Sequence, residues 1–439
     1  MMFPIVTYQS RHEELGRLYD RSSVFDHSIQ DAVREIIEAV RVRGDAAVFE
    51  LTVRFDGVRP SAIRVQRDRA AAALEGLDRE IRSIIEEAAA NIRAFHEKQV
   101  RPSWFSEEED GVVLGQRYVP LDRVGVYVPG GTAAYPSSVL MNVIPAQVAG
   151  VREILLASPP GPSGIPHPAV LAAAHLLGIE HVFAMGGAQA VAAFAYGTES
   201  VPKVDKIVGP GNAYVAAAKK EVFGRVAIDA IAGPSEIVVL ADRSASAEYV
   251  AADLLSQAEH DSRASAVLVT TDRRLAEEVQ HIAGEMVLKL PRKDVVMESL
   301  QGFGAAIVVE TLDEAIEAVN ELAPEHLEIH TADPGSIIPR IRHAGAIFIG
   351  PYSPEPVGDY FAGPNHVLPT GGTARYASAL GVEEFVRRQS IVSYTGARLE
   401  RTGPRIATFA RAEGLEAHAR AVEVRLRDLK RSPDRNNEA

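Results

Sequence analysis

The sequence has 439 residues, enough for about three compact units at roughly 150 residues each. Its composition, with 46% hydrophobic and 24% charged residues, is typical of a soluble globular protein and excludes disordered and fibrous proteins. The net charge of -13 argues against binding to nucleic acid, so a small-molecule partner is expected. Because the sequence contains no cysteine, disulfides, thiolate metal sites and cysteine nucleophiles are excluded, and any metal must be held by histidine, carboxylate or amide groups.

The N-terminal part of the chain has apolar residues at the three- and four-residue spacing of helices. Helices are predicted over 29–52 and 67–100, and 1–110 is predicted to be a helical segment that packs on an α/β core. The first residues lack the basic segment and the long apolar segment of a secretion signal, so a cytoplasmic protein is expected.

Short β-branched runs alternate with alanine-rich helical stretches from about Val112 onward, which is the pattern of βαβ units with a parallel sheet. A first Rossmann-like domain is predicted over 111–235 and a second, similar one over 236–380. The uncharged stretch 124–151 contains several prolines, so it is predicted to be buried core and loop rather than a membrane span.

A long loop rich in glycine and proline is predicted over 351–376, and loops of this length in compact domains are usually functional or disordered. Strand and helix return after it, so 381–439 is predicted to be a C-terminal arm with a polar tail. The predicted fold class is therefore α/β, with two incomplete Rossmann-like parallel-sheet halves, a helical N-terminal lead-in and a C-terminal helical arm.

Glycine-rich turns follow three of the predicted parallel strands, over 127–131, 185–189 and 209–212. Such turns aim backbone N–H groups and a helix N-terminus at an anion, as nucleotide phosphates require. Because parallel strands share one carboxyl edge, the three turns are expected to lie together there. The alternative is that they are tight strand-to-helix turns without a ligand, since none has the GxGxxG fingerprint.

Histidines lie beside other possible metal ligands at several places. Gln257 and His260 are three residues apart in a predicted helix, which places them on one face as two ligands of one ion require. Asp359 and His366 lie in the long loop. A solvated polar surface is the alternative for the helical pair, and also for Glu413 and His418 at the start of the last helix.

Glu325 and His326 stand side by side where a predicted helix, ended by Pro324, gives way to a strand. An imidazole titrates near neutral pH, so this pair is a reasonable general-base arrangement. A helix-capping role is the alternative.

The whole chain resembles the histidinol dehydrogenase family. The residues that carry the resemblance span nearly the full length: RGDAAVFELTVRFDGV, ANIRAFHEKQ, VGVYVPGG, GGAQAVAAFAYGT, VDKIVGPGNAYVAAAKK, IDAIAGPSEIVVLAD, LLSQAEHD, APEHLEI, GDYFAGPNHVLPTGGTAR, FVRRQSIVSY and EGLEAHARAVEVRL. Together these motifs are far more specific than any one of them.

The resemblance implies one zinc ion per subunit and NAD as cofactors. It implies four zinc ligands: Gln257, His260, Asp359 and His418. The same four residues, with Ser235, His326, His366 and Glu413, are implied to bind the substrate. Tyr127, Gln189 and Asn212 match the NAD-contacting positions, and Glu325 and His326 match the catalytic pair.

The implied reaction is the four-electron oxidation of L-histidinol, through L-histidinaldehyde, to L-histidine with two NAD, the last steps of histidine biosynthesis. In the absence of any thiol, the aldehyde is expected to react through its hydrate, with Glu325 activating the water and His326 taking the hydroxyl proton. The family also implies a homodimer whose C-terminal residues complete the partner's site, and neither a nucleic acid nor a membrane as partner.

Three alternatives remain open. The first is a related zinc- and NAD-dependent dehydrogenase of another small polar alcohol. The second is a zinc hydrolase in which Glu325 activates a metal-bound water. The third is a ligand-binding protein without catalysis, although Glu325 and His326 are both retained.

Overall fold

The computed structural model describes residues 2–19, 27–130 and 135–431. Contacts divide the chain into two compact units. The first comprises Met1–Gln99 and Leu121–Phe385, and the second comprises Val100–Pro120 and Val386–Ala439.

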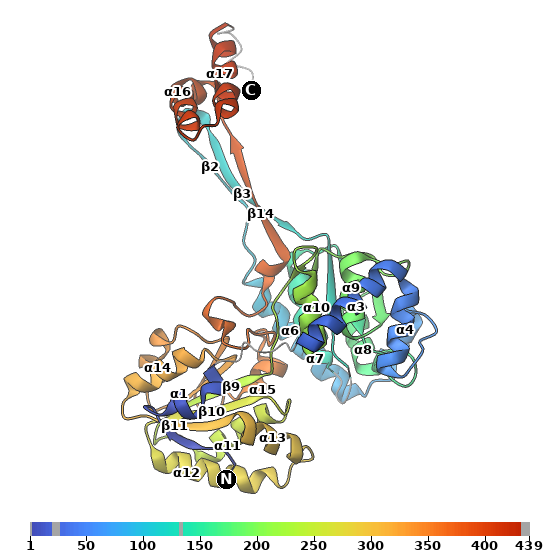
Figure 1. Cartoon of the computed structure of the whole chain (residues 1–439), viewed down its shortest axis with the longest axis vertical. Helices are drawn as coiled ribbons and strands as arrows, with labels where there is room; N and C mark the ends of the chain where they lie inside the picture. The colour runs from blue at the N-terminus through green and yellow to red at the C-terminus, as the bar shows by residue number, and fades with distance from the viewer. Residues whose placement is uncertain (1, 20–26, 131–134, 432–439) are drawn as a thin grey trace. The chain divides into compact units, whose positions relative to one another are not determined.

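A five-stranded parallel sheet lies in the first unit, with the strand order β6-β5-β4-β7-β8 (Figure 1). Its strands are β4 (Arg123–Tyr127), β5 (Glu153–Ser158), β6 (His181–Ala184), β7 (Lys206–Val208) and β8 (Ala227–Ile228). The helices between them are α7 (Pro136–Ala149), α8 (Pro168–Leu176), α9 (Gly187–Tyr196) and α10 (Ala213–Val222). The strand order reverses between β4 and β7, and doubly wound sheets bind ligands at such a reversal.

A six-stranded parallel sheet lies in the same unit, with the order β1-β11-β10-β9-β12-β13. Its strands are β1 (Ile5–Thr7), β9 (Glu236–Ala241), β10 (Ser265–Thr270), β11 (Gly304–Val308), β12 (His326–His330) and β13 (Ala346–Ile349). Its helices are α11 (Ala247–Ala258), α12 (Arg273–Val287), α13 (Lys293–Phe303) and α14 (Leu312–Leu322), with short α1 (Arg11–Glu14) and α2 (Gly16–Tyr19) near the N-terminus. Apart from β1, this sheet repeats the strand order of the first.

Four N-terminal helices complete the layers around the five-stranded sheet: α3 (His27–Arg43), α4 (Asp45–Asp56), α5 (Arg67–Glu75) and α6 (Arg79–Glu97). Neighbouring strand residues alternate between the two faces. Leu155 packs in the core that holds residues of α3, α4, α9 and α10, and Leu156 in the core that holds residues of α5 to α8. Helices of the N-terminal segment therefore cover both faces of the five-stranded sheet.

The six-stranded sheet has one polar segment among its buried strands. In β12, Leu327 and Ile329 lie in the apolar core that includes residues of α14. The alternation of strand side chains therefore turns His326, Glu328 and His330 toward the opposite face, where α11 packs. All three of these polar side chains are buried, so this face of β12 is lined by titratable groups instead of an apolar core.

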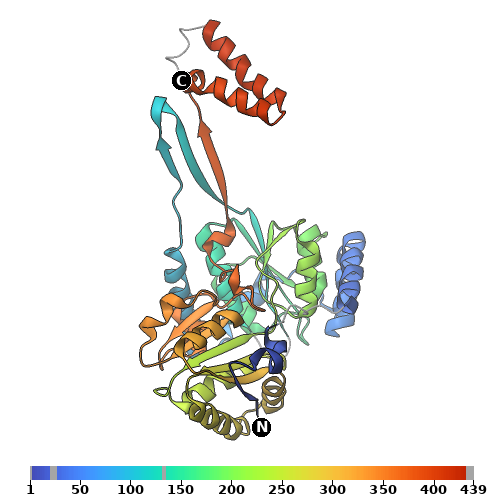
Figure 2. The same cartoon turned by 60° about the vertical axis from the view of Figure 1, so that its left-hand side comes forward.

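The second unit is a three-stranded antiparallel sheet followed by two helices, as Figure 2 shows. The sheet has the order β14-β3-β2, formed by β2 (Trp104–Glu107), β3 (Val113–Pro120) and β14 (Val386–Ser393). The helices are α16 (Gly396–Ala412) and α17 (Glu416–Arg431). The helices pack closely at Gly403, where a Cβ would lie 2.9 Å from a Leu426 methyl group and that side chain would have to shift.

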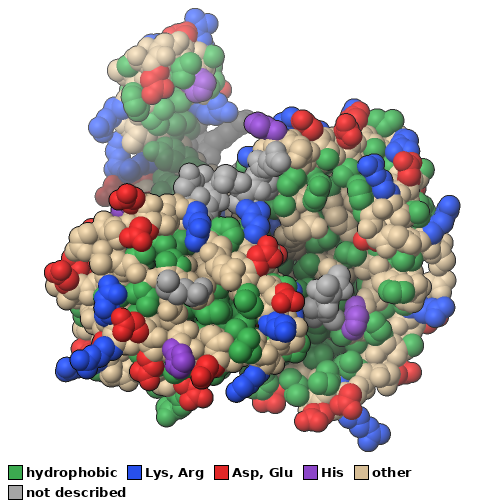
Figure 3. Space-filling model, turned by 60° about the horizontal axis from the view of Figure 1, so that its bottom comes forward, with side chains coloured by type: hydrophobic (Ala, Val, Ile, Leu, Met, Phe, Trp, Pro, Cys, Tyr) green, Lys and Arg blue, Asp and Glu red, His purple; other side chains and the backbone are tan. Residues whose placement is uncertain are grey.

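The distribution of charged and apolar residues agrees with the composition of a globular protein. On the face drawn in Figure 3, basic side chains are scattered among acidic ones and do not gather into a patch. Among the described residues, no helix combines the length and apolar character that crossing a membrane needs. The predicted polar tail, 432–439, lies outside the described residues.

The structure differs from the sequence-based expectation in three segments. Residues Ile5–Thr7 form the edge strand β1 of the six-stranded sheet, although the lead-in was expected to be helical. Residues 113–120 pair with Val386–Ser393 instead of joining the first Rossmann-like sheet. The long loop contains the short helix α15 (Glu355–Val357) and a π-helical turn, Gly358–Ala362. Both unexpected pairings join residues far apart in sequence, which local periodicity does not report.

Candidate active site

The predicted catalytic pair lies at the amino end of β12, where the chain turns from helix to strand. Helix α14 ends at Ala323, which adopts a left-handed backbone with a φ of 47°. Pro324 then prevents the helix from continuing. This sharp reversal places Glu325 and His326 against the first residue of β9, Glu236.

Glu325 is a buried carboxylate held by the backbone. Its Oε2 accepts a hydrogen bond from the Glu236 N–H at 2.9 Å. Burial raises the pKa of Glu325 well above its usual range, and the nearby Glu236 carboxylate adds to the shift. A carboxylate with a raised pKa binds a proton more strongly, which suits a general base.

His326 is held as a neutral imidazole with one free nitrogen. Its Nδ1 lies 3.0 Å from the Glu236 carbonyl oxygen, which can only accept, so we assign the ring proton to Nδ1. Its Nε2 is buried and has no hydrogen-bond partner among the described residues. Burial also lowers the pKa of His326, which keeps the ring neutral. The lone pair on Nε2 is therefore available to a proton or a metal.

A group of acidic side chains faces this nitrogen from the loop after β13. Asp359, in the π-helical turn, places Oδ1 3.8 Å from His326 Nε2. Glu355, in α15, is buried, and one ligand atom from each of these three residues lies within 4.8 Å of the others. Burial and the Glu355 carboxylate raise the pKa of Asp359 well above its usual range. Two buried carboxylates this close together favour either a shared proton or a cation.

Gln257 lies in the last turn of α11, and His260 lies just after it and near the same acids. Gln257 is completely buried, and neither its amide nitrogen nor its amide oxygen has a partner within the described part of the chain. Next to it, Ser256 donates to Glu355 Oε2 at 3.4 Å, and His260 Nε2 lies 3.9 Å from Glu355 Oε1. The expectation that both residues lie on one helical face was wrong, because α11 ends at Ala258 and His260 follows in a turn.

His366 and Ser235 belong to neighbouring loops. His366 is enclosed, and its Nε2 has no partner among residues 2–19, 27–130 and 135–431. Burial lowers the pKa of His366 to about 4, and the smaller effects of His326 and His260 place it near both. Ser235 directly precedes β9, and its carbonyl accepts a hydrogen bond from Ser265 at 2.9 Å.

Glu413 and His418 belong to the second unit. Glu413 caps the end of α16, and His418 lies in the first turns of α17, where both are exposed. The cluster formed within the first unit does not include them, so their assignment to the site stays a prediction.

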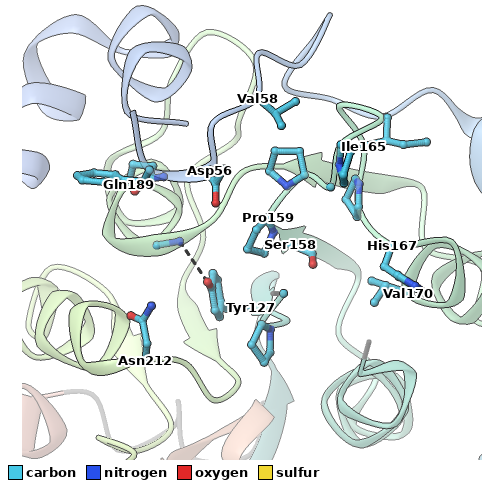
Figure 4. A pocket seen from close by; sticks show the side chains of 18 of the residues that line it. Asp56, Val58, Tyr127, Ser158, Pro159, Ile165, His167, Val170, Gln189 and Asn212 are labelled. Carbon is cyan, nitrogen blue, oxygen red and sulfur yellow. Dashed lines mark hydrogen bonds between the residues drawn. The ribbon is translucent and has the colours of Figure 1, made fainter. Parts of the chain in front are cut away.

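A pocket of about 820 Å³ opens at the carboxyl edge of the five-stranded sheet (Figure 4). Tyr127, Gln189 and Asn212 all line it, so the expectation that three glycine turns meet at this edge is confirmed for the described residues. Gly131, at the end of the first turn, lies outside them.

Each of the three side chains has a distinct setting in this pocket. The Tyr127 hydroxyl accepts a hydrogen bond from the Gly187 N–H at 3.1 Å. Asn212 caps α10 by accepting from the N–H groups of Tyr214 and Val215, both at 3.1 Å. Gln189 is buried, and its amide atoms have no partner in the described chain. Buried amide atoms of this kind are usually satisfied, so those of Gln189 point to a missing ligand.

Glycine is required in the third turn. Gly209 has a φ of 108°, and a Cβ there would lie 2.1 Å from the Tyr127 carbonyl oxygen. Any side chain would therefore push β7 away from β4 at the point where the strand order reverses. The turn keeps the backbone close and the start of α10 open to the pocket.

Comparison with known proteins gives the family. The family model described as histidinol dehydrogenase matches residues 19–426. The histidinol dehydrogenase of Geobacillus kaustophilus is 59% identical over 395 residues, covering 90% of this chain and 93% of that protein. The chain belongs to the histidinol dehydrogenase family.

Two further histidinol dehydrogenases are similar to this chain. The histidinol dehydrogenase of Bacillus subtilis is 55% identical over 397 residues, covering 90% of this chain and 93% of that protein. The crystal structure of histidinol dehydrogenase from Elizabethkingia anophelis superposes with a TM-score of 0.92 at 37% identity, covering 98% of this chain and 99% of that one. The predicted family, the α/β fold class and the predicted dehydrogenase class are thereby confirmed.

Sequence reasoning missed Glu355 and a second buried group. Glu355 stands four residues before Asp359 in the same loop, and this spacing of two acids was a signal for it. The second group is Asp253, Glu328 and His330, whose ligand atoms also lie within 4.8 Å of one another. Burial, with the Glu328 charge, raises the pKa of Asp253 to about 8. Glu328 accepts from the Glu355 N–H at 2.7 Å, so this group supports the turn that carries Glu355.

Proposed function

We propose that this protein oxidises L-histidinol, through L-histidinaldehyde, to L-histidine with two NAD, in the last steps of histidine biosynthesis and in the cytoplasm. The observation that carries the proposal is the neutral, buried His326 with a free Nε2 beside Asp359, in a member of this family. A dehydrogenase of an alcohol needs a base near the hydroxyl group, and His326 has both the protonation state and the burial for that task.

The side chains around His326 suit one zinc ion per subunit. Gln257 has buried polar atoms without partners among the described residues, and Glu355 and Asp359 are close enough to repel each other. A cation would relieve both conditions, and the donors are the nitrogen and oxygen groups that zinc accepts. In this proposal Gln257, His260 and Asp359 hold the ion, together with His418 from the arm of a second copy. Zinc, when bound, supplies a Lewis acid that orients and polarises the amino alcohol.

The protein groups then have separate tasks in the two oxidations. His326 takes the hydroxyl proton on Nε2, while its Nδ1–H bond to the Glu236 carbonyl fixes the ring. Glu325 takes a proton from the water that adds to the aldehyde, and its raised pKa makes the carboxylate a stronger base. Ser235, His366 and Glu413 complete the substrate contacts. Because the site is buried, the intermediate aldehyde is shielded from bulk water.

The pocket at the five-stranded sheet is the proposed NAD site, where Tyr127, Gln189 and Asn212 contact the cofactor. NAD, when bound, accepts the hydride in each oxidation. Helices α9 and α10 begin at this pocket, and their first N–H groups favour the charge of the diphosphate. The unpartnered Gln189 amide gives the cofactor a donor and an acceptor.

The second unit is the proposed dimer arm, which brings Glu413 and His418 to the site of the partner. Its sheet and helices leave large apolar side chains exposed, including Val392 (67%), Phe409 (70%) and Ile406 (40%). Exposed apolar groups gathered on one small unit are typical of a surface that another chain covers. The homodimer therefore rests on this apolar surface together with family membership.

The first experiment measures NADH formed per L-histidinol consumed by the purified protein, before and after a chelator and after zinc is added back. Two NADH per histidinol, abolished by chelation and restored by zinc, is the expected result. His326→Asn should lose this turnover, whereas His281→Asn, on the exposed side of α12, should retain it. One NADH with release of aldehyde, or turnover only with another alcohol, would contradict the proposed function.

A further inference from the structure

One carboxylate in the proposed NAD pocket has no task in the reaction described so far. Asp56 ends helix α4 and lines the pocket, and Figure 4 shows its carboxyl pointing into the cavity above Tyr127. Its Oδ2 is buried and has no hydrogen-bond partner among the described residues. The Asp56 charge also contributes to the raised pKa of Tyr127, so the two side chains are close.

The position of Asp56 is unfavourable for a carboxylate in the protein alone. The C-terminal end of a helix carries partial negative charge, which repels an anion. Burial raises the pKa of Asp56 to about 6, and no cation or hydrogen bond from the described residues opposes the shift. Asp56 is half-buried with Oδ2 enclosed, so a ligand that donates a hydrogen bond to it would satisfy an acceptor that the described protein leaves without a partner.

The charge of the surrounding pocket limits what that ligand can be. The described residues that line the pocket include no lysine and no arginine, and Asp56 is the only carboxylate among them. A phosphate group next to Asp56 would therefore meet a negative charge with no cation to balance it. A hydroxyl group, in contrast, can donate a hydrogen bond to the carboxylate.

We infer that Asp56 accepts a hydrogen bond from the adenosine ribose of the dinucleotide and thereby selects NAD over NADP, whose ribose carries a 2′-phosphate. Nucleotide-binding α/β proteins use an acidic side chain for a ribose hydroxyl in the same way, but there it follows the second strand. Here the carboxylate comes from a helix of the N-terminal segment, outside the sheet.

One side of the pocket lies near the proposed substrate residues, and this sets the orientation of the dinucleotide. His366 contacts Ser137, which lies at the start of α7, just after the turn that follows Tyr127. The nicotinamide end therefore belongs near the start of α7. In Figure 4, Asp56 and Val58 enter the pocket from the N-terminal segment, and apolar Val58 and Ile165 line the pocket and suit an adenine ring.

The inference rests on the proposed function, and direct binding measurements separate the two. Dissociation constants of NADH and NADPH would be measured by fluorescence for the wild type, Asp56→Asn and Asp56→Ala, with Glu50→Gln as control. Glu50 lies on the same helix, exposed and paired with Arg43, so its substitution removes the same charge outside the pocket. L-Histidinol turnover with NAD is measured in parallel, because its absence in the wild type would contradict the proposed function alone.

The expected result is a change in preference and not a uniform loss of binding. The wild type should bind NADH at least about a hundredfold more tightly than NADPH, and Asp56→Asn should reduce that ratio about tenfold or more by strengthening NADPH binding. Asp56→Ala should weaken NADH binding by roughly tenfold, since a hydrogen bond to a charged acceptor is lost. Glu50→Gln should leave the ratio unchanged.

A modified cofactor tests the contact itself. NADH lacking the adenosine 2′-hydroxyl should bind the wild type more weakly than NADH does, but should bind Asp56→Ala as well as NADH does. Thermal melting of both variants checks that they are folded. An NADH-to-NADPH ratio that is the same in the wild type and both Asp56 variants, or an equal loss from the missing hydroxyl in the wild type and Asp56→Ala, would overturn the assignment.

Discussion

Lys219→Met is expected to weaken the fold and the nucleotide pocket together, because one buried ion pair holds the Gly209 turn. The side chains of Lys219 and Asp229 form an ion pair and are only 2% and 5% exposed. Lys219 Nζ donates to the Gly209 carbonyl at 3.0 Å, and Asp229 Oδ2 accepts from the Gly209 N–H at 2.8 Å. The pair therefore binds both backbone groups of Gly209, at the turn that leads into α10.

The magnitude follows from burial. Removing one partner of a buried ion pair leaves the other charge without compensation and costs about 3–5 kcal/mol. Water cannot take the place of the lysine, since both side chains are enclosed. At roughly 2 °C per kcal/mol for a large domain, the melting temperature should fall by about 6–10 °C. NADH binding should weaken as well, because Gly209 loses a contact that fixes the turn.

The assay is thermal melting and NADH binding of the metal-free protein. Lys220→Met is the matched control, since Lys220 is the next residue of the same helix and is exposed. The double variant Lys219→Met with Asp229→Asn should recover much of the stability, because it no longer buries an unpaired charge. A melting temperature of Lys219→Met within about 1 °C of the wild type, or a double variant as unstable as the sum of the single ones, would refute the reasoning.

Further predictions concern the catalytic pair, the pH dependence of stability and the arm. Glu325→Gln should slow the aldehyde step more than His326→Asn does, measured by rapid kinetics from L-histidinol and from L-histidinaldehyde; equal losses in both half-reactions would contradict the division of tasks. The pKa of His366 is about 4 in the fold against an ordinary 6.5, so the unfolded chain takes up the proton first. The contribution of the neutral His366 ring to the free energy of unfolding is therefore fully present above pH 6.5 and lost as the pH falls toward 4. Between pH 6.5 and pH 4 the melting temperature of the metal-free wild type should fall relative to that of His366→Gln. Melting temperatures that change equally with pH in both proteins would contradict this prediction. Phe409→Asp should shift the protein toward monomer and lower activity on dilution, whereas Leu288→Asp, equally exposed on the first unit, should not; sedimentation that shows an unchanged dimer would contradict the proposed arm.

The sequence predicts the parts of this fold that depend on local pattern. The glycine turns after β4, β6 and β7 are visible because strand, glycine and helix follow one another within a few residues. Glu325 and His326 are found because Pro324 marks the change from helix to strand. Local pattern cannot show which face of β12 is polar, since Leu327 and Ile329 alternate with polar residues as they would in a solvated strand.

The remaining features depend on contacts between distant segments. Asp56 is the last residue of an ordinary helix, and its role depends on a pocket lined mostly by residues more than about 70 positions later. Glu355 lies in a loop whose glycines and prolines obscure its helical turns, and its burial depends on contact with α11 and β12. No periodicity records either contact, because both form only when the sheets have assembled.

The pairing of β1 with β11 sets an order of events during synthesis. Ile5–Thr7 lies beside Ala306–Val308, about 300 residues later in the chain. At about 5–20 residues per second, the first strand is translated roughly 15–60 seconds before its neighbour exists. All segments of the five-stranded sheet and its covering helices have been translated by then, whereas the N-terminal strand is still unpaired. β12 and β13 are translated later still, so the six-stranded sheet cannot be completed before β1 has been exposed for that interval, during which a ribosome-bound chain can mispair.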